Sequence, residues 1–338
     1  MFKLKQIPED FVVEECLDLK LRKRGRYGYY LLKKRGITTT RAVSIIARKF
    51  RVKEKYINYS GLKDKCAVTS QYISISRGPA RSLSERSFTL TYLGRGNARI
   101  NLSSHSANRF EIVVRNLLSR PRELPQYVNY FDEQRFGESK LNHVIGRAIL
   151  KRDFKSACEM IPETREHLSN FPRDYVGALS RLPGKLVRLF CHAYQSYLWN
   201  EQVSLALSKF QHKEIFLPLN PPQRLVVPLE DVGSLKGKRK MLVGASYLPT
   251  EIAQREGLTR EMMNVKQFRG LVLSSKMREI FMDVRKLRIG KLERDELNEG
   301  KFKVRVEFVL PSGSYATMLV KQLFIDEKQE KSPVSAER

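Results

Sequence analysis

The stretch from Tyr59 to Ile75, YSGLKDKCAVTSQYISI, decides how this 338-residue chain is organised. Its last residues, Tyr72 to Ile75, alternate along the chain in a way that predicts a strand with one buried face. Its first part holds a small turn at Ser60-Gly61, followed by Asp64 between two lysines. Asp64 is therefore expected where a loop meets a sheet, a position at which rigid elements often hold reactive side chains. The alternative is a solvated lysine–aspartate–lysine turn.

The composition points to a polyanionic partner. The chain has 63 Lys and Arg against 36 Asp and Glu, a net charge of +27, whereas its 41% hydrophobic residues are ordinary for a globular protein. Such an excess of cations favours nucleic acid or an anionic membrane surface. No apolar run approaches the ~20 residues that span a bilayer, so no membrane partner is expected. The N-terminal sequence lacks the apolar segment of a signal peptide, which predicts a cytoplasmic protein.

Cysteine and histidine spacing gives no sign of a metal centre. The cysteines are widely separated, with no C-x-x-C pair and no histidine at zinc-ligand spacing; they are Cys16, Cys66, Cys158 and Cys191. We interpret them as reduced and structural. The glycine-rich stretch Gly233–Lys240 lacks the G-K-[ST] ending of a phosphate loop. The sequence therefore predicts neither a metal nor a cofactor.

A basic segment with interleaved tyrosines runs from Lys20 to Arg35. It holds eight basic residues and no acidic one, together with Tyr27, Tyr29 and Tyr30. Cations beside aromatic rings suit a surface that follows an RNA backbone and stacks on bases. The alternative is a basic hairpin on a solvated sheet edge. The RNA-binding candidates in this segment are Lys20, Arg22, Lys23, Arg24 and Arg26.

Periodicity predicts the remaining elements. Strands are expected at Phe11–Val13, Phe110–Arg115 and Phe302–Val309, and helices at Thr38–Phe50, Leu141–Met160 and Leu186–Phe210. Trp199, in the last of these helices, is expected to anchor a core. Leu90–Asn101 is interpreted as a turn-rich basic connection. A turn at Pro311–Ser314 is expected to lead into a further helix.

Six stretches, in order along the chain, resemble the TruD family of pseudouridine synthases. They are PEDFVVEE (Pro8–Glu15), YSGLKDKCAVTSQ (Tyr59–Gln71), ANRFEIVVR (Ala107–Arg115), NYFDEQRFG (Asn129–Gly137), SYLWN (Ser196–Asn200) and LPSGSYATMLVKQLF (Leu310–Phe324). Each is weak alone, but six in the family's order over nearly the whole chain are specific. The resemblance is poorest between about residues 148 and 267.

The resemblance implies an α+β fold, in which a mixed, mainly antiparallel sheet with flanking helices forms the catalytic domain. The family inserts a second, α/β domain into this catalytic domain. Residues 1–147 and 268–326 are therefore expected to form the catalytic domain, residues 148–267 the insertion, and residues 327–338 a polar tail.

The activity implied by the resemblance is isomerisation of uridine to pseudouridine in tRNA. The usual target in the family is uridine 13 of the D-arm region, and some relatives also modify an anticodon-loop uridine. No cofactor or metal is implied, and a monomer is expected. The alternative is a non-catalytic, basic RNA-binding or chaperone protein that keeps the fold and uses only its charge.

Site residues follow from the same motifs. Asp64 matches the family's catalytic aspartate, and Lys5 matches a lysine near it; the alternative for Lys5 is a surface lysine. Phe110 matches an aromatic residue that packs on the flipped-out uracil, or it is part of a strand core. Asn108 would bind near the aspartate or the flipped nucleotide. Arg135 would contact phosphate or lie in a packed turn with an internal ion pair.

Overall fold

A computed structural model describes residues 2–101 and 107–326 of the chain. These residues divide into two compact units. The described residues of the first unit are 2–101, 107–121, 283–313 and 326, and those of the second unit are 122–282 and 314–325. The domain boundaries expected from the sequence, at 147/148 and 267/268, both fall inside the second unit. The polar tail, residues 327–338, lies outside the described residues.

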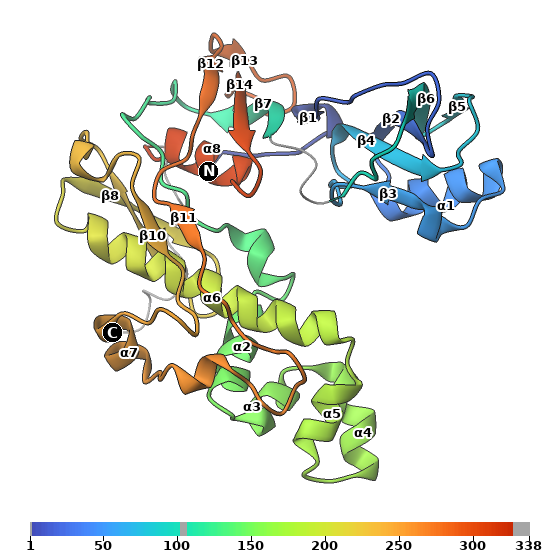
Figure 1. Ribbon diagram of the computed structural model, residues 1–338. Coiled ribbons are helices and arrows are strands. Elements are labelled where there is room, and N and C mark those ends of the chain that lie inside the picture. Colours follow the sequence, from blue (N-terminus) through green and yellow to red (C-terminus); the bar gives the residue numbers. More distant parts are fainter. Residues whose placement is uncertain (1, 102–106, 327–338) are drawn as a thin grey trace. The chain divides into compact units, whose positions relative to one another are not determined.

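The first unit is built on one mixed sheet (Figure 1). Its strand order is β12-β14-β7-β1-β4-β2-β6-β5, with β13 paired to β14 and β3 to β4. Only β1 and β4 run parallel; the other pairs are antiparallel, which confirms the expected mixed, mainly antiparallel sheet. The strands are β1 (Phe11–Cys16), β2 (Tyr27–Arg35), β3 (Ile57–Tyr59), β4 (Val68–Ser76), β5 (Leu83–Glu85), β6 (Phe88–Gly96), β7 (Ala107–Leu117), β12 (Arg285–Ile289), β13 (Glu293–Arg294) and β14 (Phe302–Pro311).

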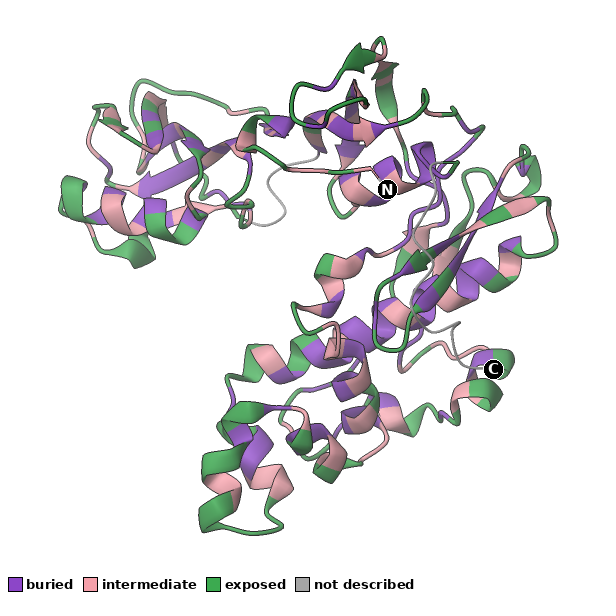
Figure 2. Cartoon of the chain, turned by 180° about the vertical axis from the view of Figure 1, so that it is seen from behind, coloured by how far each residue is buried: buried purple, intermediate pink, exposed green. Residues whose placement is uncertain are grey.

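Helix α1 (Thr39–Phe50) packs on this sheet as its periodicity predicted. The Thr38 hydroxyl accepts a hydrogen bond from the Arg41 amide and caps the helix. The buried face of α1 joins side chains of β2, β4 and β6 in one core: Ala42, Val43, Ile46, Ala47 and Phe50 with Tyr30, Leu32, Ile73, Ile75, Phe88 and Leu90. Figure 2 shows the alternation of buried and exposed residues along these elements.

Two tyrosines that the sequence suggested for base stacking belong to the protein interior. Tyr29 and Tyr30 are 3% and 0% exposed, and their hydroxyls donate to the carbonyls of Ala98 and Pro79. The prediction that they stack on RNA was therefore wrong. The second half of the basic segment forms a regular strand, β2, which pairs with β4 on one side and β6 on the other.

Two of the expected elements differ from the structure. Leu90–Asn101 was expected to be a turn-rich connection, but β6 occupies it as far as Gly96 and pairs along β2. A register shift and the positive φ of Gly94 (145°) accommodate the glycines within this strand. The helix expected over Leu141–Met160 is interrupted. Arg152 adopts a left-handed φ of 65°, and Asp153 caps a new helix.

The second unit is mainly helical, with two small two-stranded antiparallel sheets. Its core gathers around α6, where Trp199 is fully buried as expected. The helices are α2 (Asn142–Leu150), α3 (Phe154–Glu159), α4 (Arg165–Asn170), α5 (Tyr175–Arg181), α6 (Gly184–Leu207), α7 (Thr250–Glu256) and α8 (Ala316–Leu323). One sheet is the hairpin of β8 (His212–Leu217) and β9 (Gln223–Pro228), and the other pairs β10 (Arg239–Met241) with β11 (Met277–Glu279), which follows α7.

Candidate active site

Asp64 lies on an irregular loop between β3 and β4, as the sequence predicted. Side chains from the surrounding elements hold the backbone of this loop. The Gln71 amide donates to the Gly61 carbonyl (3.2 Å), and the Thr39 hydroxyl accepts from the Lys63 amide (3.0 Å). Thr39 in turn donates to Gln71 (3.0 Å). Thr39 and Gln71 therefore hold the loop from the side of the sheet and α1, while the Asp64 side chain is 46% exposed to solvent.

Lys5 contacts this carboxylate. Its Nζ lies 2.5 Å from Asp64 Oδ2, and the Lys5 side chain is 19% exposed. The same ammonium lies over the ring of Phe11, 4.3 Å from its centroid. The structure thus brings together the two ends of the charged pair that the motifs suggested, although 59 residues separate them.

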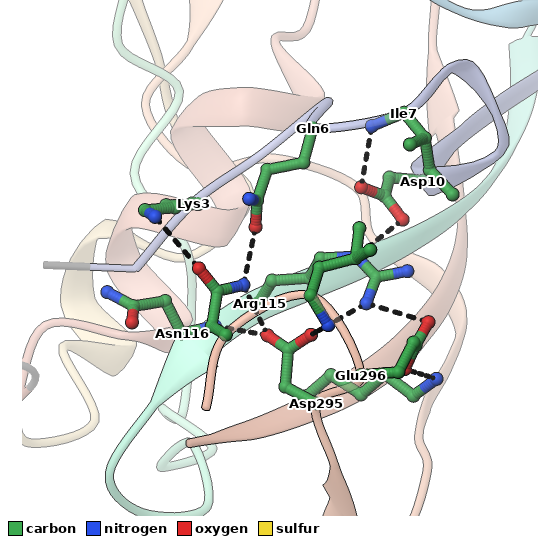
Figure 3. A network of polar contacts seen from close by, with 11 residues as sticks. Lys3, Gln6, Ile7, Asp10, Arg115, Asn116, Asp295 and Glu296 are labelled. Carbon is green, nitrogen blue, oxygen red and sulfur yellow. Dashed lines mark hydrogen bonds and ion pairs between the residues drawn. The ribbon is translucent and has the colours of Figure 1, made fainter. Parts of the chain in front are cut away.

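Contacts of the neighbouring residues Lys3 and Gln6, drawn in Figure 3, fix the chain on both sides of Lys5. The backbone of Lys3 pairs with Arg115 of β7, and the Lys3 ammonium donates to Asn298 (2.8 Å). Asn298 donates to the Gln6 side chain (2.7 Å). Lys5, between these anchors, has a φ of 57°, a conformation that costs a residue with a Cβ about 1 kcal/mol or more. Such strain persists where surrounding contacts determine the backbone.

A buried ionic cluster holds the next turn of this segment. Arg115, 3% exposed, donates to Asp10 and Asp295, both at 2.8 Å, and lies 3.0 Å from Glu296. Burial acts to raise the pKa of Asp295. Hydrogen bonds from the amides of Asn116 and Leu297 and from the side chains of Asn298 and Arg115 outweigh it and set the pKa at about 2. The cluster ties the PEDF motif to β7 and to the segment that follows β13 (Figure 3).

A second set of polar contacts connects the Asp64 loop with β1 and β7. The sheet register places Glu15 of β1 opposite Asn108 of β7. Lys63, next to Asp64, bridges them, with its Nζ 3.1 Å from Glu15 Oε1 and 2.9 Å from Asn108 Oδ1. The Glu15 carboxylate is fully buried and also accepts from the Ser60 hydroxyl and the Tyr72 amide. Asn108 is thus held beside the loop that carries Asp64.

Phe110 packs inside the first unit. It is 8% exposed and stacks on Phe308 of β14, with ring centroids 5.3 Å apart. It also meets Phe11 edge-on at 6.2 Å. Its ring therefore belongs to a row of aromatic side chains that begins beneath the Lys5 ammonium. A strand-core role accounts for most of its surface.

The five RNA-binding candidates of the basic segment are all exposed in the connection between β1 and β2. Arg22 pairs through its backbone with Arg95, and the Arg26 guanidinium lies 5.7 Å from the Tyr27 ring centroid. Their side chains therefore form a cationic surface on the first unit.

Arg135 lies in the second unit. Its guanidinium donates to the Ser196 hydroxyl (2.9 Å) and the His192 carbonyl (3.5 Å), and lies 5.7 Å from the Phe131 ring centroid. Arg278 lies closer to the same ring, at 4.1 Å, and burial lowers its pKa to about 10. Hydrogen bonds and an aromatic ring thus pack Arg135 into the turn that the NYFDEQRFG motif forms.

Sequence reasoning did not single out three residues that support the loop. Lys34 of β2 donates to the backbone carbonyl of Asp64, and the ion pair of Lys63 with Glu15 links the loop to the sheet. Lys63 and Glu15 lie within quoted motifs, but their contact depends on the parallel pairing of β1 with β4. Lys34 shares a strand face with Tyr30 and Leu32, since alternate residues of a strand point the same way. That alternation could have indicated from the sequence that Lys34 points into the protein interior.

The geometry of Asp64 and Lys5 is suited to nucleophilic or general-base chemistry. A half-exposed carboxylate beside one ammonium can act as nucleophile or base, because the cation orients it. Among residues 2–101 and 107–326, no group of three or more His, Cys, Asp or Glu side chains could hold a metal ion. Within the same ranges, no helix has the length and apolar character needed to cross a bilayer.

Comparison with known proteins gives the same family at every level. The family model for tRNA pseudouridine synthase D (TruD) matches residues 2–166, 162–216 and 233–323. "Probable tRNA pseudouridine synthase D 2" of Methanocaldococcus jannaschii is 31% identical over 97% of this chain and 93% of its own. tRNA pseudouridine synthase D of Aquifex aeolicus is 28% identical over 96% and 98%. A crystal structure of a TruD protein from Methanosarcina mazei superposes with a TM-score of 0.72 at 26% identity, covering 95% of this chain and 92% of that one.

The mixed sheet and the matches over nearly the whole chain therefore identify a pseudouridine synthase, an isomerase. The chain belongs to the TruD family, tRNA pseudouridine synthase D.

Proposed function

We propose that this enzyme is cytoplasmic and converts uridine 13 of tRNA to pseudouridine, with Asp64 as the catalytic carboxylate. The observation that carries the proposal is the contact between Lys5 and Asp64, 2.5 Å long, at the exposed front of a loop that is fixed from behind. A second target, in the anticodon loop, belongs to the same reaction class. We further propose a monomeric enzyme.

The reaction breaks the N1–C1′ bond, turns the base and joins it to the ribose through C5, while the C5 proton is lost and N1 is protonated. Asp64 would act at the ribose, by addition to C1′ or by removal of the C2′ proton. Lys5 would orient the carboxylate. Asn108 would contact the flipped nucleotide beside the loop, and the Phe110 ring would meet the uracil. Flipping gives the enzyme access to the base.

We propose that catalysis belongs to the first unit, which holds Asp64, Lys5, Asn108 and Phe110. The exposed cations Lys20, Arg22, Lys23, Arg24 and Arg26 would bind tRNA phosphates there. In the second unit Arg135 would contribute to RNA binding. We also propose that residues 1–147 and 268–326 act as the catalytic domain, which would include the first unit, and that residues 148–267 are the inserted domain.

The test is to incubate the protein with bulk unmodified tRNA and to map new pseudouridines by carbodiimide-dependent primer stops. New stops at position 13 are expected. Stops only at other positions would refute the choice of uridine, and an unchanged pattern would refute the activity. A primary isotope effect with C2′-deuterated uridine would assign Asp64 as base, whereas its absence would favour addition to C1′.

A further inference from the structure

The ammonium group of Lys34 lies directly behind the loop that carries Asp64. Lys34 is 1% exposed, and its Nζ donates to the carbonyl oxygens of Ile37 (2.9 Å), Lys63 (3.2 Å) and Asp64 (2.7 Å). An ammonium has three donors, so these bonds use its full capacity. Two of the three acceptors belong to Asp64 itself and to the residue before it.

These bonds complete the support of an irregular segment. Residues 61–64 form neither helix nor strand, and side chains of three different elements bind their backbone. Gln71 of β4 holds the Gly61 carbonyl, and Thr39 of α1 holds the Lys63 amide. Lys34 of β2 holds the end of the segment at Asp64. Because β2 and β4 are paired over their whole length, Lys34 and Gln71 stand on a common, rigid base.

Stability alone does not explain a charged group at this position. Burial disfavours the ammonium and lowers the pKa of Lys34 to about 8, although the nearby Asp64 acts in the opposite direction. An apolar side chain of similar length would fill the space without this desolvation cost. What it would lack is the means to hold two carbonyl groups at the loop's end.

We propose that Lys34 is a positioning residue for the reaction: by holding the main-chain carbonyl of Asp64, its ammonium fixes the direction in which the Asp64 carboxylate points. Lys34 has no access to the substrate and takes no part in bond making. The proposal rests on the proposed function, because the step that it affects is the action of Asp64 at the ribose. A misplacement of about 1 Å at such a group can cost about 10²-fold in rate.

The test compares Lys34→Met with Lys49→Met, which removes an ammonium from an exposed site on α1. We expect Lys34→Met to lower kcat about 10²-fold with tRNA affinity nearly unchanged, and Lys49→Met to match the wild type. Circular dichroism at the assay temperature, together with a thermal melting curve, establishes that each variant is folded during the assay. A folded Lys34→Met with wild-type kcat would overturn the proposal.

A rescue experiment separates positioning from a purely structural role. Lys34→Ala lacks three carbons and the ammonium, which propylammonium replaces atom for atom. We expect propylammonium to raise kcat of Lys34→Ala, and 1-propanol, of the same length without the charge, to leave it low. Equal effects of the two additives would overturn the proposal. Absence of pseudouridine with the wild type and Lys49→Met as well would instead refute the proposed function on which it rests.

Discussion

Replacing Arg115 with methionine tests whether the buried ionic cluster holds the first unit together. The change removes the cation shared by Asp10 and Asp295, whose side chains are 1% and 0% exposed, and leaves both carboxylates buried without it. Breaking one buried pair in this way costs about 3–5 kcal/mol. The partner Glu296 is 53% exposed and adds little. We therefore expect a loss of about 3–5 kcal/mol, which lowers the melting temperature by roughly 10 °C.

The matched control is Arg109→Met on the same strand, β7. Arg109 pairs with Glu14 and Glu307 at the surface, so its loss should cost less than about 1 kcal/mol. Differential scanning calorimetry of both variants gives the comparison. Adding Asp295→Asn to Arg115→Met should recover part of the loss, because one uncompensated charge disappears. Equal melting temperatures for Arg115→Met and Arg109→Met would refute the reasoning.

The same cluster predicts how stability depends on pH. The pKa of Asp295 in the folded protein is about 2, below its ordinary value of 3.8. A depressed carboxyl pKa stabilises the folded state fully above the ordinary value, and this contribution is lost as the pH falls from 3.8 towards 2. It amounts to about 2 kcal/mol at neutral pH. Acid unfolding of wild type and Asp295→Asn should therefore differ in this window, and parallel curves would contradict the assignment.

Three further perturbations test other parts of the structure. Phe110→Leu should reduce turnover more than tRNA affinity. Phe308→Leu, which changes the ring stacked on Phe110, should reduce stability alone. Equal losses of turnover in the two variants would show that Phe110 acts only as a core residue. The tRNA association constant should fall steeply as the salt concentration rises. Changing Arg22, Lys23 and Arg24 to alanine should reduce the slope of log association constant against log salt concentration by about 0.7–0.9 per lost phosphate contact. An unchanged slope would exclude these residues from the interface. Burial lowers the pKa of His143 to about 4, and its ring nitrogens have no hydrogen-bond partner among the described residues. The free energy of unfolding should therefore fall by about 3 kcal/mol as the pH decreases from 6.5 to 4. Urea titrations of His143→Phe should show no such loss.

Local patterns were sufficient for much of the fold. Helix α1 carries its capping threonine and its apolar face within a dozen residues, and β14 alternates cleanly. Both could be predicted because the signal and the element coincide in sequence. The interruption at Arg152 could not, because an arginine gives no local sign of a left-handed backbone.

The site was predictable only where a motif names a residue directly. Asp64 and Lys5 were found by their motifs, although their contact depends on how the chain segment before β1 crosses the sheet. Lys34 looked like one more cation in a basic run, and Tyr29 and Tyr30 looked like stacking surfaces. Composition could not separate inward from outward residues there. The alternation of Tyr30, Leu32 and Lys34 on one strand face does separate them.

The most direct measurement is pseudouridine formation under single-turnover conditions by wild type and Asp64→Asn, with tRNA binding measured on the same samples. The substitution preserves the size of the side chain and removes its charge. If Asp64 attacks the ribose, the variant binds tRNA with near wild-type affinity and forms no pseudouridine. Pseudouridine formed by the variant at the wild-type rate would contradict the role given to this carboxylate.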